Sequence, residues 1–497
     1  MKDRICGNKW FPLVFLPIAA VFVLFFSTST SPFYDNEGFD SMLFKQMGLA
    51  VLQGKIPYVD LFEHKGPIIF YINALGQWIV PGRTGILLVQ FMFMSFTLVL
   101  WWKTIRLFLR PFVSFVTVLC LLALLIGFYA LGNQCEEYMM PFACGALYIS
   151  LKHLFSERKS LRNTDSLLLG LCFGFLFFVR PNDAVSQVGG LVFGLGILLV
   201  MDGGYKTLLR NALSFTAGFV LIALPILAWF GHHGALEDMY YGMVTHNSNY
   251  AGGFVAFIKP CFGKKLFLLP LFFMTLLLAR DLSKRLFLLL LPVEILSYLL
   301  IGVKLADHYF MPWMASLFLL LFSLTLQRKE KRIWIITLLF LHSGLKDVLT
   351  YYHKDFFKAL AVKIKVENIE RVNKKTLSDQ YCEEGYKLID AIPPSERDKI
   401  HNYNLTQQFL SLLWKRNIVQ ANYVPLPAME YNDKEGRLRR RNDIQIKKPT
   451  WILFRHTSDH TTLTYTNDSL YIEQHYELVG RTDSRCGEDV SLYRRKE

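Results

Sequence analysis

The chain has 497 residues, of which 53% are hydrophobic and 19% are charged, and its mean hydropathy is +0.29. Soluble proteins carry about 25% charged residues, so this composition excludes an ordinary soluble enzyme. The net charge of +14 first suggests nucleic acid, but much of the excess lies in short loops between apolar runs. There it sets the orientation of a membrane protein, and we expect no nucleic-acid partner.

Up to about residue 345, apolar runs of roughly 14 to 20 residues alternate with short polar loops, and the rest of the chain has no such run. Only helices or closed barrels satisfy their backbone hydrogen bonds in lipid, and these runs lack the alternation of a barrel strand. We therefore predict a polytopic α-helical membrane domain over residues 1–345. A soluble domain is predicted over residues 346–497.

The first apolar run is predicted to span residues 10–30. It follows Lys2, Arg4 and Lys9, as in a signal peptide, but no clear small-residue cleavage site precedes Asp35. We therefore expect an uncleaved first transmembrane helix.

The loop at residues 31–67 concentrates ionisable side chains beside this span. Asp35 and Glu37 lie near its start, and His64 and Lys65 precede a Gly-Pro turn at its end. Charged groups at a bilayer are costly to keep and indicate function. A solvated loop with ordinary charges is the alternative.

Within this loop, apolar residues recur at helical spacing from Phe39 to Val51 and predict a helix over residues 39–53. Its other face carries Asp40, Lys45 and Gln53, which fits a helix lying on the membrane surface. A short globular helix is the alternative.

Residues 68–80 form an apolar segment bounded by Pro67 and Pro81. About 13 residues at 1.5 Å per residue reach only ~20 Å, less than the ~30 Å hydrocarbon core. We therefore expect a re-entrant or interfacial helix here.

Ten further runs complete a prediction of about eleven transmembrane helices. They are residues 85–102, 112–131, 139–151, 166–179, 185–201, 211–230, 266–279, 286–302, 310–326 and 333–345. With 68–80 excluded, alternation places every short basic loop on the inner side, as the positive-inside rule requires. These loops are 103–110, 152–162, 206–210, 280–285 and 328–332. The same alternation places the C-terminal domain outside.

The remaining polar motifs then converge on the outer side. They are residues 35–37, 63–67, 133–138, 180–183, 231–265 and 304–309. The tail adds a basic helical stretch at 354–375, strand-like runs at 451–454 and 470–472, and a closing hairpin that pairs 476–479 with 491–495. This pattern predicts a small α+β domain, in which Cys382 and Cys486 could pair in an oxidising compartment.

The outer-side carboxylates suit several roles. Asp35 and Glu37, two positions apart, can act as a general base, hold a divalent cation or cap the following helix. Glu136 and Glu137 are adjacent in sequence, so they point to different faces and only one is expected to enter a shared cavity.

The outer-side cations nearest the span ends are Lys65, Arg180 and Lys304. Each can bind a phosphate, or extend to the lipid headgroups. His64 and His308 can donate to a phosphate, bind a metal, or be ordinary interfacial histidines. Carboxylates and cations in one cavity suit group transfer from a lipid phosphate, because the leaving phosphate needs positive charge and the incoming hydroxyl needs a proton acceptor.

The first loop carries a family resemblance. Its order is Asp35-Asn36-Glu37-Gly38, then residues 54–60, then His64-Lys65-Gly66-Pro67 followed by Phe70 and Tyr71. It resembles the first outer loop of the bacterial C-type polytopic glycosyltransferases of family 39, relatives of protein O-mannosyltransferases and of the lipid A aminoarabinose transferase. Weaker similarity lies at 134–137, 179–181 and 307–312, and many relatives have Pro-Pro where this chain has Gly66-Pro67.

The resemblance implies the C-type fold and an inverting transferase that uses a polyprenyl-phosphate-linked sugar. It implies action at the outer face of the bacterial inner (cytoplasmic) membrane, with a periplasmic C-terminal domain and a glycan, lipid or protein acceptor. By the same resemblance Asp35 is the base and Glu37 orients the acceptor or a metal. The implied substrate-binding set is His64, Lys65, Glu137, Arg180, His308 and Tyr309. Family members differ in metal dependence, so no cofactor is assigned and a divalent cation stays open.

Two other functions fit a protein with many spans and outer-face charges. A transporter or flippase of lipid-linked sugars commonly shows repeated halves and broken helices near the midplane, and this sequence shows no such symmetry. A glycan polymerase or ligase that uses the same lipid carriers is disfavoured only by the first-loop motif. Neither the donor sugar nor the acceptor can be read from the sequence.

Overall fold

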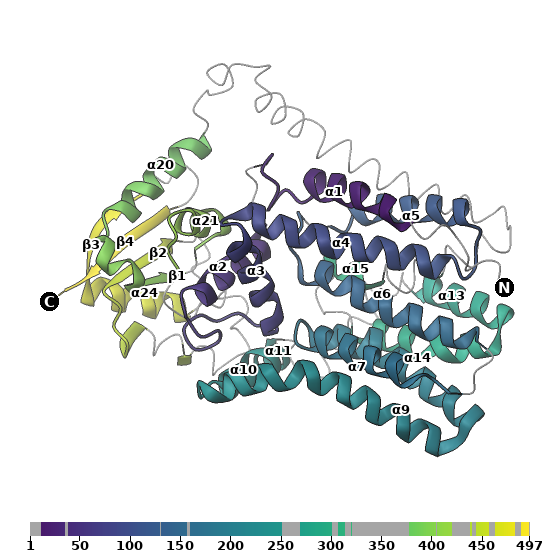
Figure 1. The fold of residues 1–497 in the computed structure, drawn as a ribbon. Coiled ribbons are helices and arrows are strands. Elements are labelled where there is room, and N and C mark those ends of the chain that lie inside the picture. Colours follow the sequence, from purple (N-terminus) through teal and green to yellow (C-terminus); the bar gives the residue numbers. More distant parts are fainter. Residues whose placement is uncertain are drawn as a thin grey trace, which may run out of the picture.

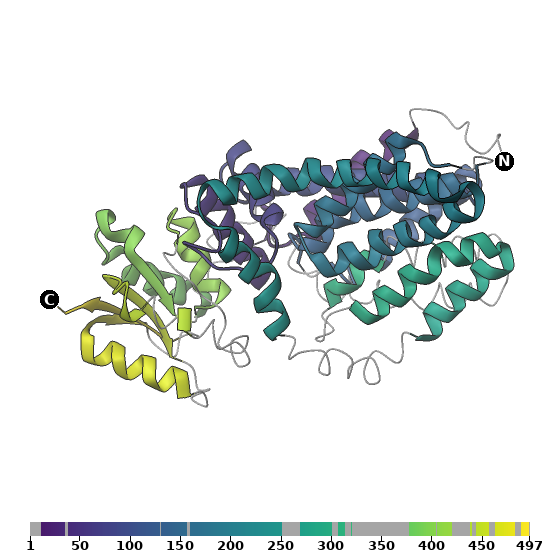
Figure 2. The same ribbon diagram turned by 90° about the horizontal axis from the view of Figure 1, so that it is seen from below.

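The computed structural model of the chain describes residues 11–34, 38–129, 131–156, 160–250, 269–300, 307–313, 320, 377–403, 405–419, 438–439, 444–456, 463–482 and 489–496. It contains a large helical part and, beside one end of it, a small sheet with accompanying helices (Figure 1). Figure 2 shows the same two parts from below.

The helical part follows the predicted apolar runs, and each predicted span between residues 85 and 300 overlaps a helix, although α5 ends at Ile126 and not at the predicted residue 131. In chain order its elements are the 3-10 turn η2 (Phe11–Val14), α1 (Phe15–Phe26), α2 (Phe39–Leu52), α3 (Pro67–Ile79), α4 (Arg83–Ile105), α5 (Pro111–Ile126), α6 (Cys135–Leu154), α7 (Asn163–Phe177), α8 (Pro181–Asp183), the π-helical turn η3 (Ala184–Gly189), α9 (Gly190–His232), α10 (Leu236–Tyr240), the π-helical turn η4 (Tyr241–Thr245), α11 (His246–Tyr250), α13 (Leu269–Leu282), α14 (Lys284–Leu300), the 3-10 turn η7 (Asp307–Phe310) and α15 (Met311–Trp313).

The helices run back and forth between two ends of the helical part (Figures 1 and 2). The connections after α4, α6 and α13, and a bend within α9, lie at one end. They carry four of the five basic loops that were predicted to share the inner side. The fifth, 328–332, lies outside the described residues. The opposite end carries the start of α2, the start of α6 and the turn between α7 and α8.

A bend at Gly204 explains why two predicted spans, 185–201 and 211–230, appear as one long element. Gly204 has φ 69° and ψ −177°, a left-handed conformation that L side chains rarely adopt. A Cβ on Gly196 would lie 3.7 Å from Leu208 Cδ1, so the segments on either side of the bend lie against each other. The element is therefore a helical hairpin.

Two helical segments of the described chain are long and apolar enough to cross a membrane. They are Arg83–Ile105, with 23 residues, and Pro181–His232, with 52 residues that include the hairpin. Phe11–Phe26, Pro111–Ile126 and Asn163–Phe177 are shorter apolar helices. The predicted count of about eleven spans is not confirmed, and 333–345 lies outside the described residues.

Helix α2 matches the helix predicted at 39–53, but part of its polar face is covered, while Asp40 is partly exposed and Gln53 is exposed. Lys45 and Gln46 are 0% and 1% exposed. The helix packs between α3 and α21 (Gln407–Lys415) of the C-terminal part. A Cβ on Gly48 would lie 2.7 Å from the backbone nitrogen of Ala74, so α2 and α3 touch through their backbones. A short packed helix therefore describes α2 better than a helix lying on a membrane surface.

Helix α3 confirms the length of the predicted short segment. It has 13 residues, begins at Pro67 after Gly66 and ends before Pro81. A Cβ on Gly85 of α4 would lie 1.9 Å from the carbonyl oxygen of Gly76, so α3 and α4 are in backbone contact. Its place as a re-entrant or interfacial helix stays a prediction.

The C-terminal part contains a four-stranded sheet in the order β1-β2-β4-β3. Its strands are β1 (Ile400–Tyr403), β2 (Trp451–His456), β3 (Tyr476–Arg481) and β4 (Asp489–Arg495), and its helices are α20 (Leu377–Asp390), η10 (Pro394–Lys399), α21 (Gln407–Lys415) and α24 (Leu463–His475). β1 and β2 pair in parallel, and the other neighbours are antiparallel. The domain boundary predicted at 345/346 lies outside the described residues. The side chains of Cys382 and Cys486, which could pair in an oxidising compartment, are not among the described ones either.

The strands predicted in the tail are partly correct. The strand at 451–454 and the hairpin that joins 476–479 to 491–495 correspond to β2, β3 and β4. The strand predicted at 470–472 is wrong, because these residues lie in α24. A run of only three apolar residues does not distinguish the period of a strand from that of a helix.

Polar contacts join the C-terminal part to the first loop. Gln46 Nε2 donates to the carbonyl oxygen of Leu410 at 3.0 Å, and Trp414 Nε1 donates to Gln77 Oε1 at 2.8 Å. Lys45 Nζ lies 5.3 Å from the centre of the Trp414 ring. Helix α21 therefore fixes the two short helices that follow the acidic motif.

Candidate functional site

The acidic motif itself, with Asp35 and Glu37, lies outside the described residues. Its two ends are held against the helical part. Tyr34 Oη donates to the carbonyl oxygen of Phe25 at 2.8 Å, and the Gly38 N–H donates to Ser29 Oγ at 3.0 Å. Lys45 Nζ also donates to the carbonyl oxygen of Ser29. Tyr34 and Gly38, the two residues that flank the motif, are therefore both held by the segment at residues 25–29.

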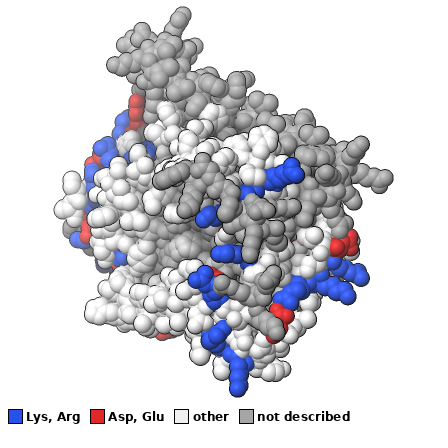
Figure 3. Space-filling view, turned by 45° about the vertical axis from the view of Figure 1, so that its right-hand side comes forward, with Lys and Arg blue, Asp and Glu red and all other residues white. Residues whose placement is uncertain are grey.

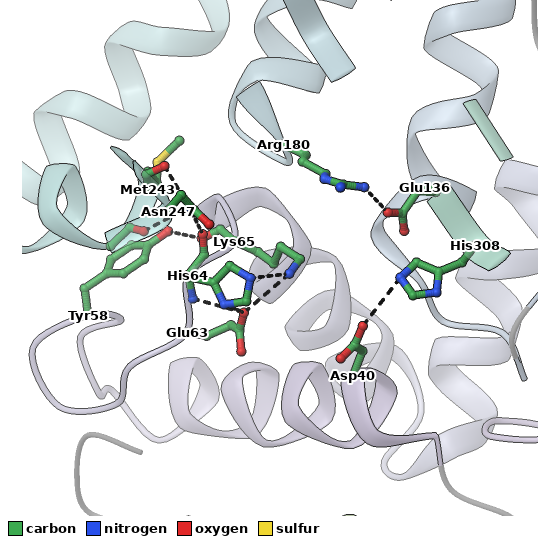
Figure 4. A network of polar contacts seen from close by, with 11 residues as sticks. Asp40, Tyr58, Glu63, His64, Lys65, Glu136, Arg180, Met243, Asn247 and His308 are labelled. Carbon is green, nitrogen blue, oxygen red and sulfur yellow. Dashed lines mark hydrogen bonds and ion pairs between the residues drawn. The ribbon is translucent and has the colours of Figure 1, made fainter. Parts of the chain in front are cut away.

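Lys65 lies in a buried row of polar contacts (Figure 4). Its Nζ is 2.6 Å from His64 Nε2, and His64 Nδ1 is 3.0 Å from Glu63 Oε1. The row therefore runs from the Lys65 ammonium through the His64 ring to the Glu63 carboxylate.

The row keeps both its charges at neutral pH. Burial alone would raise the pKa of Glu63, but His64 and Lys65 outweigh burial and lower that pKa to about 2. Burial alone would lower the pKa of Lys65, but Glu63 and Asp40 outweigh it and raise that pKa. The contribution of ionised Glu63 to stability is therefore present above its unfolded-state pKa and is lost as the pH falls through about 2.

Two hydrogen bonds hold the backbone of this row. Tyr58 Oη donates to the carbonyl oxygen of Lys65 at 2.6 Å, and Asn247 Nδ2 donates to that of His64 at 2.9 Å (Figure 4). Tyr58 has φ 70°, and α11 supplies Asn247 from far along the chain. Nothing in the local sequence around His64 indicates either partner.

The Gly-Pro turn joins this row to Arg180. The Gly66 N–H donates to the carbonyl oxygen of Val179 at 2.9 Å, and the Ile68 N–H donates to that of Phe178 at 3.1 Å. A Cβ on Gly66 would lie 2.1 Å from the carbonyl oxygen of Phe178. Glycine is thus required by close backbone approach, and a proline here would lack the N–H.

The substitution Gly66→Ala is expected to separate Lys65 from Arg180. The added methyl group meets backbone, which cannot give way as a side chain can, so we expect a loss of about 1–3 kcal/mol in stability. The affinity for an anionic ligand that contacts both cations should fall. Gly145→Ala in α6 is the control, because its Cβ would meet nothing closer than 3.9 Å. Equal behaviour of the two variants would contradict the positioning role.

Arg180 lies among carboxylates and an aromatic ring. Its Nη1 forms an ion pair with Glu136 Oε1 and lies 3.2 Å from Asp183 Oδ2. Its guanidinium carbon is 4.1 Å from the centre of the Tyr309 ring, the geometry of a cation–π contact. Arginine does not lose its proton in proteins, so this end of α7 always presents a positive charge.

His308 completes the group from far along the chain. Its Nε2 lies 3.8 Å from Asp40 Oδ2 on α2 (Figure 4). The neighbouring Tyr309 carries the ring on which Arg180 lies, and Asp183 pairs with Arg180. The described members of the predicted phosphate-binding set therefore lie at one end of the helical part.

Glu137 is the exception in the predicted set. Its carboxylate faces away from Arg180 and accepts from Tyr129 Oη, from Gln90 Nε2 at 2.8 Å and from the Asn133 N–H at 2.9 Å. It thus ties α4, α6 and the connection before α6 together. Glu136 faces the site instead, which agrees with the expectation that only one of the adjacent pair enters it.

Sequence reasoning missed three carboxylate roles at this site. Asp40 was assigned to the polar face of a surface helix, yet it approaches His308. Asp183 was read only as part of a loop motif, and Glu63 only as a neighbour of His64. Their partners lie far along the chain or are reached only in a particular side-chain rotamer. The spacing of residues in the sequence therefore does not predict these contacts.

Among the described residues, no three His, Cys, Asp or Glu side chains are placed to hold one metal ion. Two buried cations on separate elements can bind the oxygens of a phosphate, because each supplies charge-assisted N–H donors. Bound phosphate would compete with Glu136 for Arg180 and would neutralise Lys65. The arrangement therefore suits an anionic group that contacts both Lys65 and Arg180.

Comparison with known proteins concerns the region that begins at the His64 row. Residues 64–229 match the family model of the dolichyl-phosphate-mannose-protein mannosyltransferases. The match begins at His64 and includes Lys65, Glu136 and Arg180. No curated protein matches the chain. The family resemblance predicted from the first loop is therefore confirmed over this region.

The fold is similar to that of ArnT from Cupriavidus metallidurans. The structure bound to undecaprenyl phosphate has a TM-score of 0.62, with 12% sequence identity and 98% of each chain covered. The apo structure has a TM-score of 0.59, with 13% identity and 97% of each chain covered. At this identity the likeness shows the fold alone, and it supports the predicted C-type architecture.

Proposed function

We propose that this chain, which resembles the mannosyltransferase family in sequence and ArnT in fold, is a membrane glycosyltransferase. It would move a sugar from a polyprenyl-phosphate carrier to a hydroxyl of a glycan, lipid or protein. The observation that carries the proposal is the pair of backbone hydrogen bonds from Gly66 and Ile68 to the end of α7. They hold Lys65 and its neighbours close to Arg180. The fold likeness to ArnT bound to undecaprenyl phosphate supports the same ligand class.

The reaction breaks the bond between the anomeric carbon and the phosphate oxygen. The acceptor oxygen attacks this carbon from the opposite face and forms the new glycosidic bond, which inverts the configuration. Negative charge develops on the leaving phosphate, where Lys65 and Arg180 stabilise it. The acceptor proton passes to a carboxylate, for which we propose Asp35, with Glu37 orienting the acceptor.

We propose that the site faces the outer side of the bacterial inner membrane, with the C-terminal part in the periplasm. The grouping of four basic loops at the other end of the helices supports this orientation, because short basic loops stay on the cytoplasmic side. The division into a membrane domain over 1–345 and a soluble domain over 346–497 is part of the same proposal.

The test is transfer by the purified protein in liposomes that contain polyprenyl phosphate carrying a radiolabelled sugar. Envelope glycans, lipids and proteins are added as three separate acceptor fractions. We expect the label to leave the carrier and enter one fraction. A flippase would instead move the intact labelled carrier across the bilayer, and that result would contradict the proposal.

A further inference from the structure

A polar pocket lies at the opposite end of α7 from Arg180. It has a volume of about 360 Å³ and is lined by Ser160, Leu161, Arg162, Asn163, Thr164 and Arg210. Helix α7 has 15 residues, which at 1.5 Å per residue separates the pocket from the Arg180 site by ~22 Å. The pocket is therefore a second site, at the end where the basic loops gather.

The pocket is suited to an anion. Arg162 and Arg210 are exposed, and neither guanidinium forms an ion pair with another described residue. Helix α7 begins here with Arg162 as its N-cap residue, whose side chain has no acceptor to cap the first N–H groups, and Asp165 also lies in the first turn. The first N–H groups of α7 and the positive end of its dipole thus add to the two cations. Together they offer fork-shaped and backbone donors to the oxygens of a phosphate.

The walls of the pocket are fixed to each other. Asn211, which is 4% exposed, donates through Nδ2 to the carbonyl oxygen of Leu161 at 3.0 Å and to Ser166 Oγ at 2.8 Å. Further along, a Cβ on Gly218 of α9 would lie 2.1 Å from the carbonyl oxygen of Leu167, so α7 and α9 are in backbone contact. The two arginines are therefore presented from elements that are packed together rather than from loose loops.

An apolar surface begins one turn away from the pocket. Leu168 of α7 is 45% exposed, and Leu209 and Leu213 of α9 are 63% and 64% exposed. Figure 3, which turns this end of the helical part forward, shows several groups of Lys and Arg side chains and fewer acidic ones. A charged pocket beside exposed leucines matches a lipid, whose headgroup is charged and whose acyl chains are apolar. A free phosphate has no apolar group that could pack against the leucines.

We propose that this pocket binds the headgroup phosphate of an anionic glycerophospholipid, with the acyl chains along the exposed leucines of α7 and α9. The basic end of the helical part lies on the side where anionic lipids attract Lys and Arg. Such a lipid would be a structural partner of the protein, distinct from the carrier lipid at the Arg180 site. The proposal depends on the membrane location but not on the transfer reaction.

The test compares two double variants in lipid nanodiscs. R162Q/R210Q removes both pocket cations, and R110Q/R280Q removes two exposed arginines at the same end outside the pocket. Retention of phosphatidylglycerol is measured by native mass spectrometry after delipidation in detergent. We expect the first variant to bind it roughly tenfold or more weakly, while the second behaves like the unchanged protein.

Four results would overturn the proposal. Equal losses in both double variants would show only a general attraction of anionic lipid to a basic surface. Equal retention of phosphatidylcholine would remove the selectivity for an anionic headgroup. Displacement of the bound lipid by 10 mM inorganic phosphate would indicate a site for a free anion. Displacement by polyprenyl phosphate at lower concentration would assign the pocket to the carrier lipid. Thermal unfolding, which should be alike in both variants, checks that each is folded.

Discussion

Asp35→Asn is expected to abolish sugar transfer while the protein stays folded. The amide keeps the size of the carboxylate but cannot accept the proton of the attacking hydroxyl, and general-base catalysis contributes about 10²- to 10⁴-fold in rate. The ends of the acidic motif are held by Ser29 and Phe25, which the substitution does not touch. The measurement is single-turnover transfer from a polyprenyl-phosphate sugar, with donor binding determined separately.

Glu37→Gln is the matched control, since it removes the neighbouring carboxylate of the same motif. It should raise the Michaelis constant for the acceptor and lower turnover less than Asp35→Asn does, because its proposed role is orientation. Near-full activity of Asp35→Asn would show that another group is the base, and the transferase proposal would survive. If only Glu37→Gln lost activity, Glu37 would be the general base and Asp35 would orient the acceptor.

Arg180→Ala is expected to weaken binding of the lipid-linked donor by roughly ten- to a hundredfold. A charge-assisted hydrogen bond contributes about 1.5–3 kcal/mol, which corresponds to that range. The turnover number should fall less than the donor affinity, because Lys65 still faces the phosphate. The measurement is binding of fluorescent polyprenyl phosphate together with a donor titration of the transfer rate.

The substitution also leaves Glu136 and Asp183 buried without their cation, so a stability control is needed. The double variant Arg180→Ala/Glu136→Gln removes one of these charges and should recover part of the thermal stability but none of the donor affinity. Arg180→Lys keeps the positive charge but loses the two parallel N–H donors of the guanidinium group, so we expect weaker but measurable binding of the donor. Recovery of donor affinity in the double variant would show that Arg180 acts only by neutralising Glu136.

Much of the helical organisation follows from local signals in the sequence. The length of an apolar run sets the length of a helix, and the grouping of Lys and Arg in alternate loops sets the direction of successive helices. These signals correctly separated the short helix α3 from the long helix α4, and they brought four basic loops to one end. They do not report the number of spans beyond the described residues.

The two wrong predictions have different causes. Lys45 and Gln46 of α2 looked solvent-facing because the sequence of α2 does not show that Trp414 and Leu410 cover them, so there tertiary packing overrode the local pattern. Residues 470–472 looked like a strand because three apolar residues fit either period, so there the local pattern itself is ambiguous.

The sequence alone indicated which residue types could form the site: three cations, two histidines and a set of carboxylates in loops that it predicts to share one side. Charged residues close to apolar runs are costly and therefore rare, so those that are present stand out in the sequence. Only the tertiary structure decided which charges pair. It brought Asp40 to His308 and turned Glu136 toward Arg180 while Glu137 faced inward. It also showed why position 66 requires glycine, because a Cβ there would lie 2.1 Å from the carbonyl oxygen of Phe178. The spacing of residues around Gly66 does not predict this contact.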